Sequence, residues 1–387
     1  MSRSCQYSFA DRSGLAEWSF DGDALVVSPA DGQPLVLPLK EVAGISGDGY
    51  TISLMVPGST PAIATSAGPA ASAAGVAARA AGPAPALALT KLGAEGPTLL
   101  DTLQRTWLVA RTKALRLGGS GEGESFSGTV TERAAAEPFR ALLFEDLMLI
   151  AREGRDLDPV FLALIENVTF DDDTYSIRVT EWPGRELVFS KLGRATEDFV
   201  DSLKKRREAL ASEAGAALST AVPSLPPAQR AVLAGEWPPG RLRTLRELDT
   251  IAPGFAQTFR DTWLPACMRK DEGAFLLEWA EAGSCWLGCS REESDSGAPL
   301  LWLLAEKSGT WFLEALGGED RATYQFSGGG ELPALVSRLL CAPQFSKEAL
   351  YGTPEMLTGE RADLAIAAQF LEFLVRLRGA FKGRIIH

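Results

Sequence analysis

Few side chains in this sequence are placed where they could do chemistry, and the clearest are two lysines that recur in one local pattern. Lys91 stands in LTKLG and Lys191 in FSKLG, each at the end of a strand-like apolar run and ahead of a predicted helix. One hypothesis makes each lysine a ligand-binding cation, repeated once per domain. The other, which we favour, is structural, because a lysine stem covers apolar surface while its ammonium group meets a carboxylate or carbonyl oxygen.

The acidic and sulfur-bearing residues suggest no reaction centre. The three aspartates at 171–173 offer oxygen ligands for a hard cation such as Ca²⁺, but they lie between two predicted strands, and a solvated hairpin turn explains them. Of the five cysteines, only Cys285 and Cys289 are spaced to share one face of a strand. A structural zinc usually needs four Cys or His ligands, and His387 is the only histidine. The sequence therefore predicts no catalytic residue, no metal and no cofactor, and we expect the protein not to be an enzyme.

Composition narrows the class of protein further. The 387 residues carry a net charge of −12 and are 46% hydrophobic, which is typical of a globular chain of two or three domains. The negative charge disfavours a nucleic-acid surface, since such surfaces neutralise phosphates with Lys and Arg. A basic run at 204–207 is interpreted as the solvated end of a helix. With no apolar run long enough to cross a bilayer and no secretory signal, we expect a cytoplasmic protein without nucleic-acid partners or stable membrane insertion.

The lysine pattern marks the ends of two similar domains. Each copy is predicted to hold seven short strands separated by turn residues and then one amphipathic helix. Aligning the copies pairs Asp48 with Asp173. The first copy alone contains an insertion of almost nothing but Ala, Gly, Pro, Ser and Thr, predicted to be disordered. The predicted organisation is domain 1 at 1–117 with the insertion at 57–86, a linker at 118–124, domain 2 at 125–216, a helical connector at 217–271 and domain 3 at 272–387.

The third domain is predicted from a weaker echo of the same pattern. Residues 274–326 are rich in strand-like runs and lead into FSGGG, where the second copy has FSKLG. Apolar residues at helical spacing follow, so we interpret this part as a degenerate third copy. The chain closes with a strong apolar stripe at 361–378, which predicts one amphipathic helix.

Seven antiparallel strands and a capping C-terminal helix resemble the pleckstrin-homology-like (PH-like) superfold. The helix of the first copy carries Trp107, where pleckstrin-homology domains typically have a tryptophan, whereas the second copy has Phe199 and Leu203. The resemblance implies an α+β protein of tandem seven-stranded antiparallel barrels, each capped by a helix, with a helical connector. Phosphoinositide binding in this family relies on clustered cations, but here only Arg12 and Arg133 occupy the corresponding first loops, each beside acids. Peptide binding along a strand edge or beside the helix fits better.

We therefore expect a non-catalytic scaffold or adaptor that binds protein partners through tandem PH-like domains. Trp182, Trp302 and Trp311 occupy edge-like positions and, with Lys91 and Lys191, are the candidate binding residues. The alternative hypothesis is a module that senses a small molecule or a phospholipid headgroup. The identity of the partner and the oligomeric state stay open at this stage.

Overall fold

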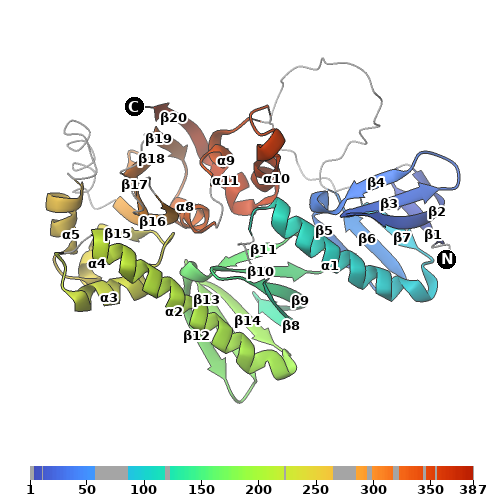
Figure 1. The fold of residues 1–387 in the computed structure, drawn as a ribbon, viewed down its shortest axis with the longest axis horizontal. Coiled ribbons are helices and arrows are strands. Elements are labelled where there is room, and N and C mark those ends of the chain that lie inside the picture. The colour runs from blue at the N-terminus through green and yellow to red at the C-terminus, as the bar shows by residue number, and fades with distance from the viewer. Residues whose placement is uncertain are drawn as a thin grey trace. The chain divides into compact units, whose positions relative to one another are not determined.

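The computed structural model describes residues 4–10, 12–56, 86–117, 123–221, 224–264, 285–293, 299–316, 322–342, 346–353 and 355–386 (Figure 1). The predicted disordered insertion and the predicted linker fall almost wholly outside these residues. The described chain has an α+β fold with three antiparallel sheets of six or seven strands, as the sequence predicts. It divides into two compact units, unit 1 (Met1–Lys113 with Ala151–Leu157) and unit 2 (Ala114–Ile150 with Asp158–His387). Among the described helices, none is both long and apolar enough to cross a membrane.

Unit 1 is built on a seven-stranded sheet and one long helix, α1 (Gly96–Ala114). The helix buries Leu99, Leu103 and Trp107, the apolar stripe that the sequence predicts. The Trp107 indole N–H donates to the carbonyl oxygen of Val42 at 2.8 Å, which ties the helix to the sheet. The strand order is β4-β3-β2-β1-β7-β6-β5. The strands are β1 (Ser4–Phe9), β2 (Arg12–Asp21), β3 (Ala24–Pro29), β4 (Leu35–Pro38), β5 (Gly44–Gly47), β6 (Thr51–Met55) and β7 (Ala86–Thr90).

A buried arginine holds the segment Ala151–Leu157 within unit 1. The Arg111 side chain is fully buried, and its Nη1 donates to the carbonyl oxygen of Lys40 at 2.6 Å. Its Nε donates to Asp156 Oδ1 at 3.0 Å, and Nη2 bonds the other carboxylate oxygen, so the pair is bidentate. Burial raises the pKa of Asp156 despite the opposing effect of Arg111. A buried guanidinium in this unit is thus matched by a carboxylate that another segment delivers.

The start of α1 is a tightly packed position at which we expect a small substitution to be costly. A Cβ atom on Gly96 would lie 1.6 Å from the carbonyl oxygen of Gly49, where nothing but backbone can give way. Gly96→Ala is therefore expected to destabilise unit 1 by about 1–3 kcal/mol, the range for overpacking. Thermal unfolding and hydrogen exchange of β5 and β6 measure the effect. Gly235→Ala is the matched control, because its Cβ would meet nothing within 4 Å, and equal losses in both variants would contradict the prediction.

The first sheet of unit 2 repeats the strand order of unit 1. Its order is β11-β10-β9-β8-β14-β13-β12, and α2 (Thr196–Ala221) follows it. The helix buries Phe199 and Leu203 against the sheet and extends beyond the predicted end, since the alanine-rich stretch at 211–221 favours helix. The strands are β8 (Glu124–Glu132), β9 (Ala135–Leu143), β10 (Leu147–Arg152), β11 (Asp158–Phe161), β12 (Ile165–Asp171), β13 (Ser176–Glu181) and β14 (Arg185–Ser190).

The third sheet has six described strands, and their order follows the chain, β15-β16-β17-β18-β19-β20. It therefore differs from the order that the first two sheets share. Its two edge strands arise outside the strand-rich region seen in the sequence, one from the connector and one from the C-terminus. The strands are β15 (Arg243–Thr244), β16 (Cys285–Glu293), β17 (Pro299–Lys307), β18 (Thr310–Leu316), β19 (Ala322–Ser327) and β20 (Phe381–Ile386).

The connector shares a core with this third sheet. Trp237, Phe255 and Phe259 are buried in one cluster with Leu287 of β16 and Leu303 of β17. The Trp237 indole N–H donates to the carbonyl oxygen of Leu287 at 3.1 Å, and its ring meets Phe255 edge to face. The connector helices are α3 (Pro227–Glu236), α4 (Leu245–Ile251) and α5 (Phe255–Thr258), followed by a π-helical turn at Phe259–Trp263.

The C-terminal helix is not continuous, contrary to the prediction for 361–378. Leu371 is extended, with φ of −73° and ψ of 111°, and separates α10 (Ala362–Phe370) from α11 (Glu372–Ala380). Leu371 is itself buried, as are Leu364 before it and Leu374 after it. The break redirects the second half while both halves stay packed. The helices α8 (Leu332–Cys341) and α9 (Glu348–Tyr351) precede this pair.

Candidate functional site

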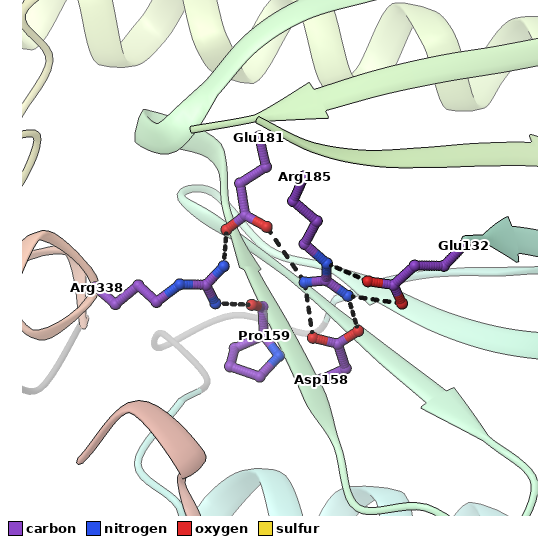
Figure 2. Close-up of polar contacts among 6 residues, drawn as sticks. All are labelled: Glu132, Asp158, Pro159, Glu181, Arg185 and Arg338. Carbon is purple, nitrogen blue, oxygen red and sulfur yellow. Dashed lines mark hydrogen bonds and ion pairs between the residues drawn. The ribbon is translucent and has the colours of Figure 1, made fainter. Parts of the chain in front are cut away.

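Two groups of charged residues lie inside unit 2, and the first is centred on Arg185. We call it the Arg185 cluster, and Figure 2 shows its five charged side chains. Glu132 ends β8, Asp158 begins β11, Glu181 ends β13 and Arg185 begins β14, so four strand ends bring them together. The fifth member, Arg338, comes from α8, far along the chain.

In the Arg185 cluster, carboxylates surround the guanidinium of Arg185. Arg185 Nε donates to Glu132 at 2.8 Å, and its Nη1 donates to Asp158 at 3.0 Å and to Glu181 at 3.2 Å. Arg185 Nη2 reaches Glu132 again at 3.3 Å and also bonds Asp158. On the opposite side, Arg338 donates to the second oxygen of Glu181 at 2.8 Å (Figure 2). Every nitrogen of the Arg185 guanidinium is therefore committed to a carboxylate.

Burial sets the electrostatics of the Arg185 cluster. Desolvation raises the pKa of Glu181, whose side chain is 0% exposed, although the charges of Arg338 and Arg185 oppose the rise. Burial acts to lower the pKa of Arg185, but the bonds to Asp158 and Glu132 and the charge of Glu181 overcome it and raise that pKa. The cluster leaves no group poised for proton transfer to a ligand. Its role is to join α8 to the second sheet.

The second group lines a cavity of about 110 Å³, which we call the arginine pocket. Arg207 of α2 donates to the carbonyl oxygen of Ile165 at 3.0 Å, and Arg241 Nη2 bonds Glu166 at 2.7 Å. Arg243 is paired with Glu236 at 3.0 Å. The pocket is lined by Leu162, Ala163, Ile165, Glu166, Arg207, Leu210, Ala211, Gly235, Glu236, Pro238, Arg241 and Arg243.

Arg241 and Arg243 have carboxylate partners, whereas Arg207 bonds only carbonyl oxygens among the described residues. Burial is the main cause that lowers the pKa of Arg207 and of Arg241, and the charge of nearby Arg243 adds to the effect on Arg241. Within the described part of the chain, the buried Nε of Arg241 has no hydrogen-bond partner. A buried donor without a partner is costly. This arrangement suits the binding of an anion.

The two lysines that opened the sequence analysis lie at equivalent turns on the surface. Lys91 and Lys191 are exposed, and both adopt a left-handed backbone with φ of 57°. Gly93 and Gly193, two residues later, have φ of 60° and 63°. This conformation favours glycine, and it explains why the pattern KLG recurs between the last strand and the helix. Neither lysine lies in the Arg185 cluster or lines the arginine pocket.

The candidate tryptophans are not grouped, and two of them are not at an edge. Trp302 and Trp311 lie on β17 and β18, in the interior of the third sheet, and both are buried. The Trp302 indole N–H donates to Ser290 Oγ at 3.1 Å, and that of Trp311 donates to the carbonyl oxygen of Gly328 at 3.2 Å. Their predicted edge position is therefore wrong, because apolar bulk there fills the core. Trp182 is half-buried and follows Glu181 of the Arg185 cluster.

The acidic turn and the cysteines also find structural places. Asp171 accepts the backbone N–H groups two and three residues ahead, at 3.0 and 3.2 Å, and Asp48 does the same in the first copy. The residue of the second copy that is structurally equivalent to Asp48 is thus Asp171, not Asp173 as the alignment indicates. The difference arises because the second hairpin turn is longer. Burial raises the pKa of the Cys285 and Cys289 thiols to about 12. Among the described residues, no three His, Cys, Asp or Glu side chains gather as a metal site requires.

The sequence analysis did not find the arginines of the arginine pocket, because the segments that carry them indicated other roles or no structure at all. Arg207 belongs to the basic run at 204–207, which we interpreted as a solvated helix end, yet Arg207 is half-buried and bonds the sheet. Arg241 and Arg243 lie in a proline-rich connector without periodic signal. A charged residue within an otherwise apolar packing segment is the one signal that could have indicated them.

No protein-family model matches the chain, and no curated protein matches it.

Proposed function

We propose that this chain is a non-catalytic adaptor of the cytoplasm that binds protein partners through tandem PH-like domains. The shared strand order of the first two sheets supports it, as does the helix that follows each sheet. In unit 2 the second sheet already holds other elements of the chain, since α8 is joined to it through Arg338 and Glu181. Such a domain is suited to binding protein segments.

One observation carries the proposal, namely a pair of exposed tyrosines at equivalent hairpins. Tyr50 lies between β5 and β6 and is 71% exposed, and Tyr175 lies between β12 and β13 and is 60% exposed. Phe170 packs edge to face against the Tyr175 ring, with the ring centres 5.7 Å apart. This contact holds the Tyr175 ring in place. Tyrosine is enriched among the residues that dominate binding energy at protein interfaces. Its presence at the same hairpin in both copies favours two similar binding surfaces.

The test combines capture with a defined variant. The full chain is used to purify partners from its native lysate, and the affinity of each purified partner is then measured. Replacing both tyrosines (Tyr50→Ser with Tyr175→Ser) is expected to weaken partner binding by more than about tenfold, since a hot-spot residue contributes about 2 kcal/mol or more. Thermal stability should change little because both side chains face solvent.

Val109→Ser is the matched control, since Val109 is an exposed apolar residue of α1 outside the hairpins. It should leave affinity unchanged. Two results would contradict the proposal: no partner enriched over a control chain, or a partner that binds the double variant as tightly as the original. Flotation of the chain with phospholipid vesicles, or a turnover of substrate by the chain, would favour the sensing or enzymatic alternatives.

A further inference from the structure

The two arginine groups of unit 2 differ in how fully their charges are matched. Arg185 is surrounded by Glu132, Asp158 and Glu181, and its pKa is raised. In the arginine pocket, Arg241 is paired with Glu166, and Arg243 is paired with Glu236 and, at 3.8 Å, with Glu247. Among the described residues, Arg207 bonds only carbonyl oxygens, so its positive charge has no carboxylate partner. The lowered pKa values of Arg207 and Arg241 and the unpartnered Nε of Arg241 agree with this imbalance. The pocket therefore lacks one carboxylate that would pair with its arginines.

In the first copy, an ion pair fills the place that corresponds to the arginine pocket. Arg207 stands at the same distance from its KLG lysine as Trp107, and the two side chains donate to equivalent carbonyl oxygens, those of Ile165 and Val42. One turn later, the first copy has Arg111 and the second has Ala211. The first copy fills this place with the Arg111 guanidinium and the Asp156 carboxylate. The second copy, with a methyl group there, has the arginine pocket instead.

We propose that the arginine pocket binds a carboxylate group supplied from outside the chain. A carboxylate carries one negative charge and so balances the guanidinium of Arg207, whereas a phosphate dianion would exceed it. Arginine presents a planar fork of donors that matches a carboxylate. The Arg111–Asp156 pair in the first copy is the same chemistry within the chain.

The size of the pocket limits the ligand. Its volume of about 110 Å³ is well above the roughly 10–15 Å³ that one water molecule needs on this measure, so a carboxylate with a short aliphatic stem fits. Two sources offer that group, a small free acid or the acidic side chain of a protein. The inference concerns the shared carboxylate chemistry and does not depend on the proposed adaptor function.

The test measures melting temperature with the full chain and defined probes. Sodium propionate and the blocked tripeptide acetyl-Ala-Glu-Ala-amide represent the two sources, and sodium chloride and sodium phosphate at equal ionic strength are the reference salts. At a probe concentration ten times its Kd, the melting temperature is expected to rise by roughly 2–4 °C over sodium chloride. A response to propionate alone identifies a free acid as the source, and a response to the tripeptide identifies a side chain.

Two variants locate the effect. Arg241→Gln removes the guanidinium whose buried Nε has no partner among the described residues, and Ala211→Leu fills the cavity while it leaves every charge in place, so it serves if the first variant folds poorly. Both should lose the response to the carboxylate probes. Arg246→Gln is the matched control, because Arg246 is exposed on α4 and does not line the pocket, and it should keep the response. The proposal is overturned if chloride or phosphate raises the melting temperature as much as the carboxylates, if no carboxylate has an effect, or if both pocket variants respond fully.

Discussion

Arg338→Met is expected to destabilise the joint between α8 and the second sheet by about 3–5 kcal/mol, the usual cost of removing one partner from a buried ion pair. Among the described residues, Glu181 would keep only Arg185 as a cationic partner, while its side chain remains buried. Methionine keeps most of the bulk of arginine, so the loss reports the charge more than the packing. Hydrogen exchange of the amides in α8, β13 and β14 measures the local opening free energy.

This cost should depend on pH in a defined direction. The folded-state pKa of Glu181 is raised above its ordinary value of about 4.5. A raised carboxylate pKa favours folding below the unfolded-state value, and that contribution is lost as pH rises through the folded-state value. Without Arg338 the pKa of Glu181 rises further, because an opposing positive charge has gone. The deficit of Arg338→Met relative to the original chain should therefore be largest at neutral pH and shrink as pH falls towards about 4.5.

Arg178→Met is the matched control on the same sheet. Arg178 pairs with Glu186 at 3.0 Å, but the two side chains are 59% and 49% exposed. Exposed pairs contribute about 0–1 kcal/mol, so this variant should lose little at any pH. Equal losses in the two variants, or a loss in Arg338→Met that does not change with pH, would show that the Arg185 cluster is not an electrostatic joint.

Trp237→Ala is expected to cost about 3–5 kcal/mol, as for large aromatic side chains removed from a core. Trp237 is buried between the connector and the third sheet, where it contacts Phe255 and donates to Leu287. The variant leaves a cavity and removes the indole donor from the carbonyl oxygen of Leu287. Because the core is shared, hydrogen exchange should accelerate in α3 and α4 and also in β16 and β17.

The distribution of the effect is what tests the shared core. If exchange accelerates only in the connector helices, the connector does not share its core with the third sheet. Tyr50→Ala is the control for loss of an aromatic ring, since Tyr50 is exposed and should cost little. A similar loss of stability in both variants would show that the burial of Trp237 does not stabilise the shared core.

Local regularities in the sequence were sufficient for much of the fold. Strand periodicity and turn residues predicted seven strands and a helix in each of the first two domains, and the structure has them. The KLG pattern predicted the strand-to-helix turn, which the positive φ of Lys91 and Lys191 confirms. Such features depend on residues close together in the chain, and so a single sequence contains them.

Other features were not readable because they depend on neighbours that are distant in sequence. Strands β15 and β20 become edges of one sheet only after the chain folds, and the break at Leu371 lies within an unbroken apolar stripe. Trp302 and Trp311 resembled edge residues because bulk alone does not distinguish a core strand from an edge strand. No periodicity records which strand will pair beside another.

The sequence by itself determined the strands, the repeated helix with its turn and the excess of negative charge, because each follows from neighbouring residues or from composition. Only the tertiary structure decided where the arginines act. Arg185 meets Glu132, Asp158 and Glu181 because four strand ends converge, and Arg338 joins them from another part of the chain. The strength of a buried charge depends on distance and desolvation, and both are properties of the folded chain.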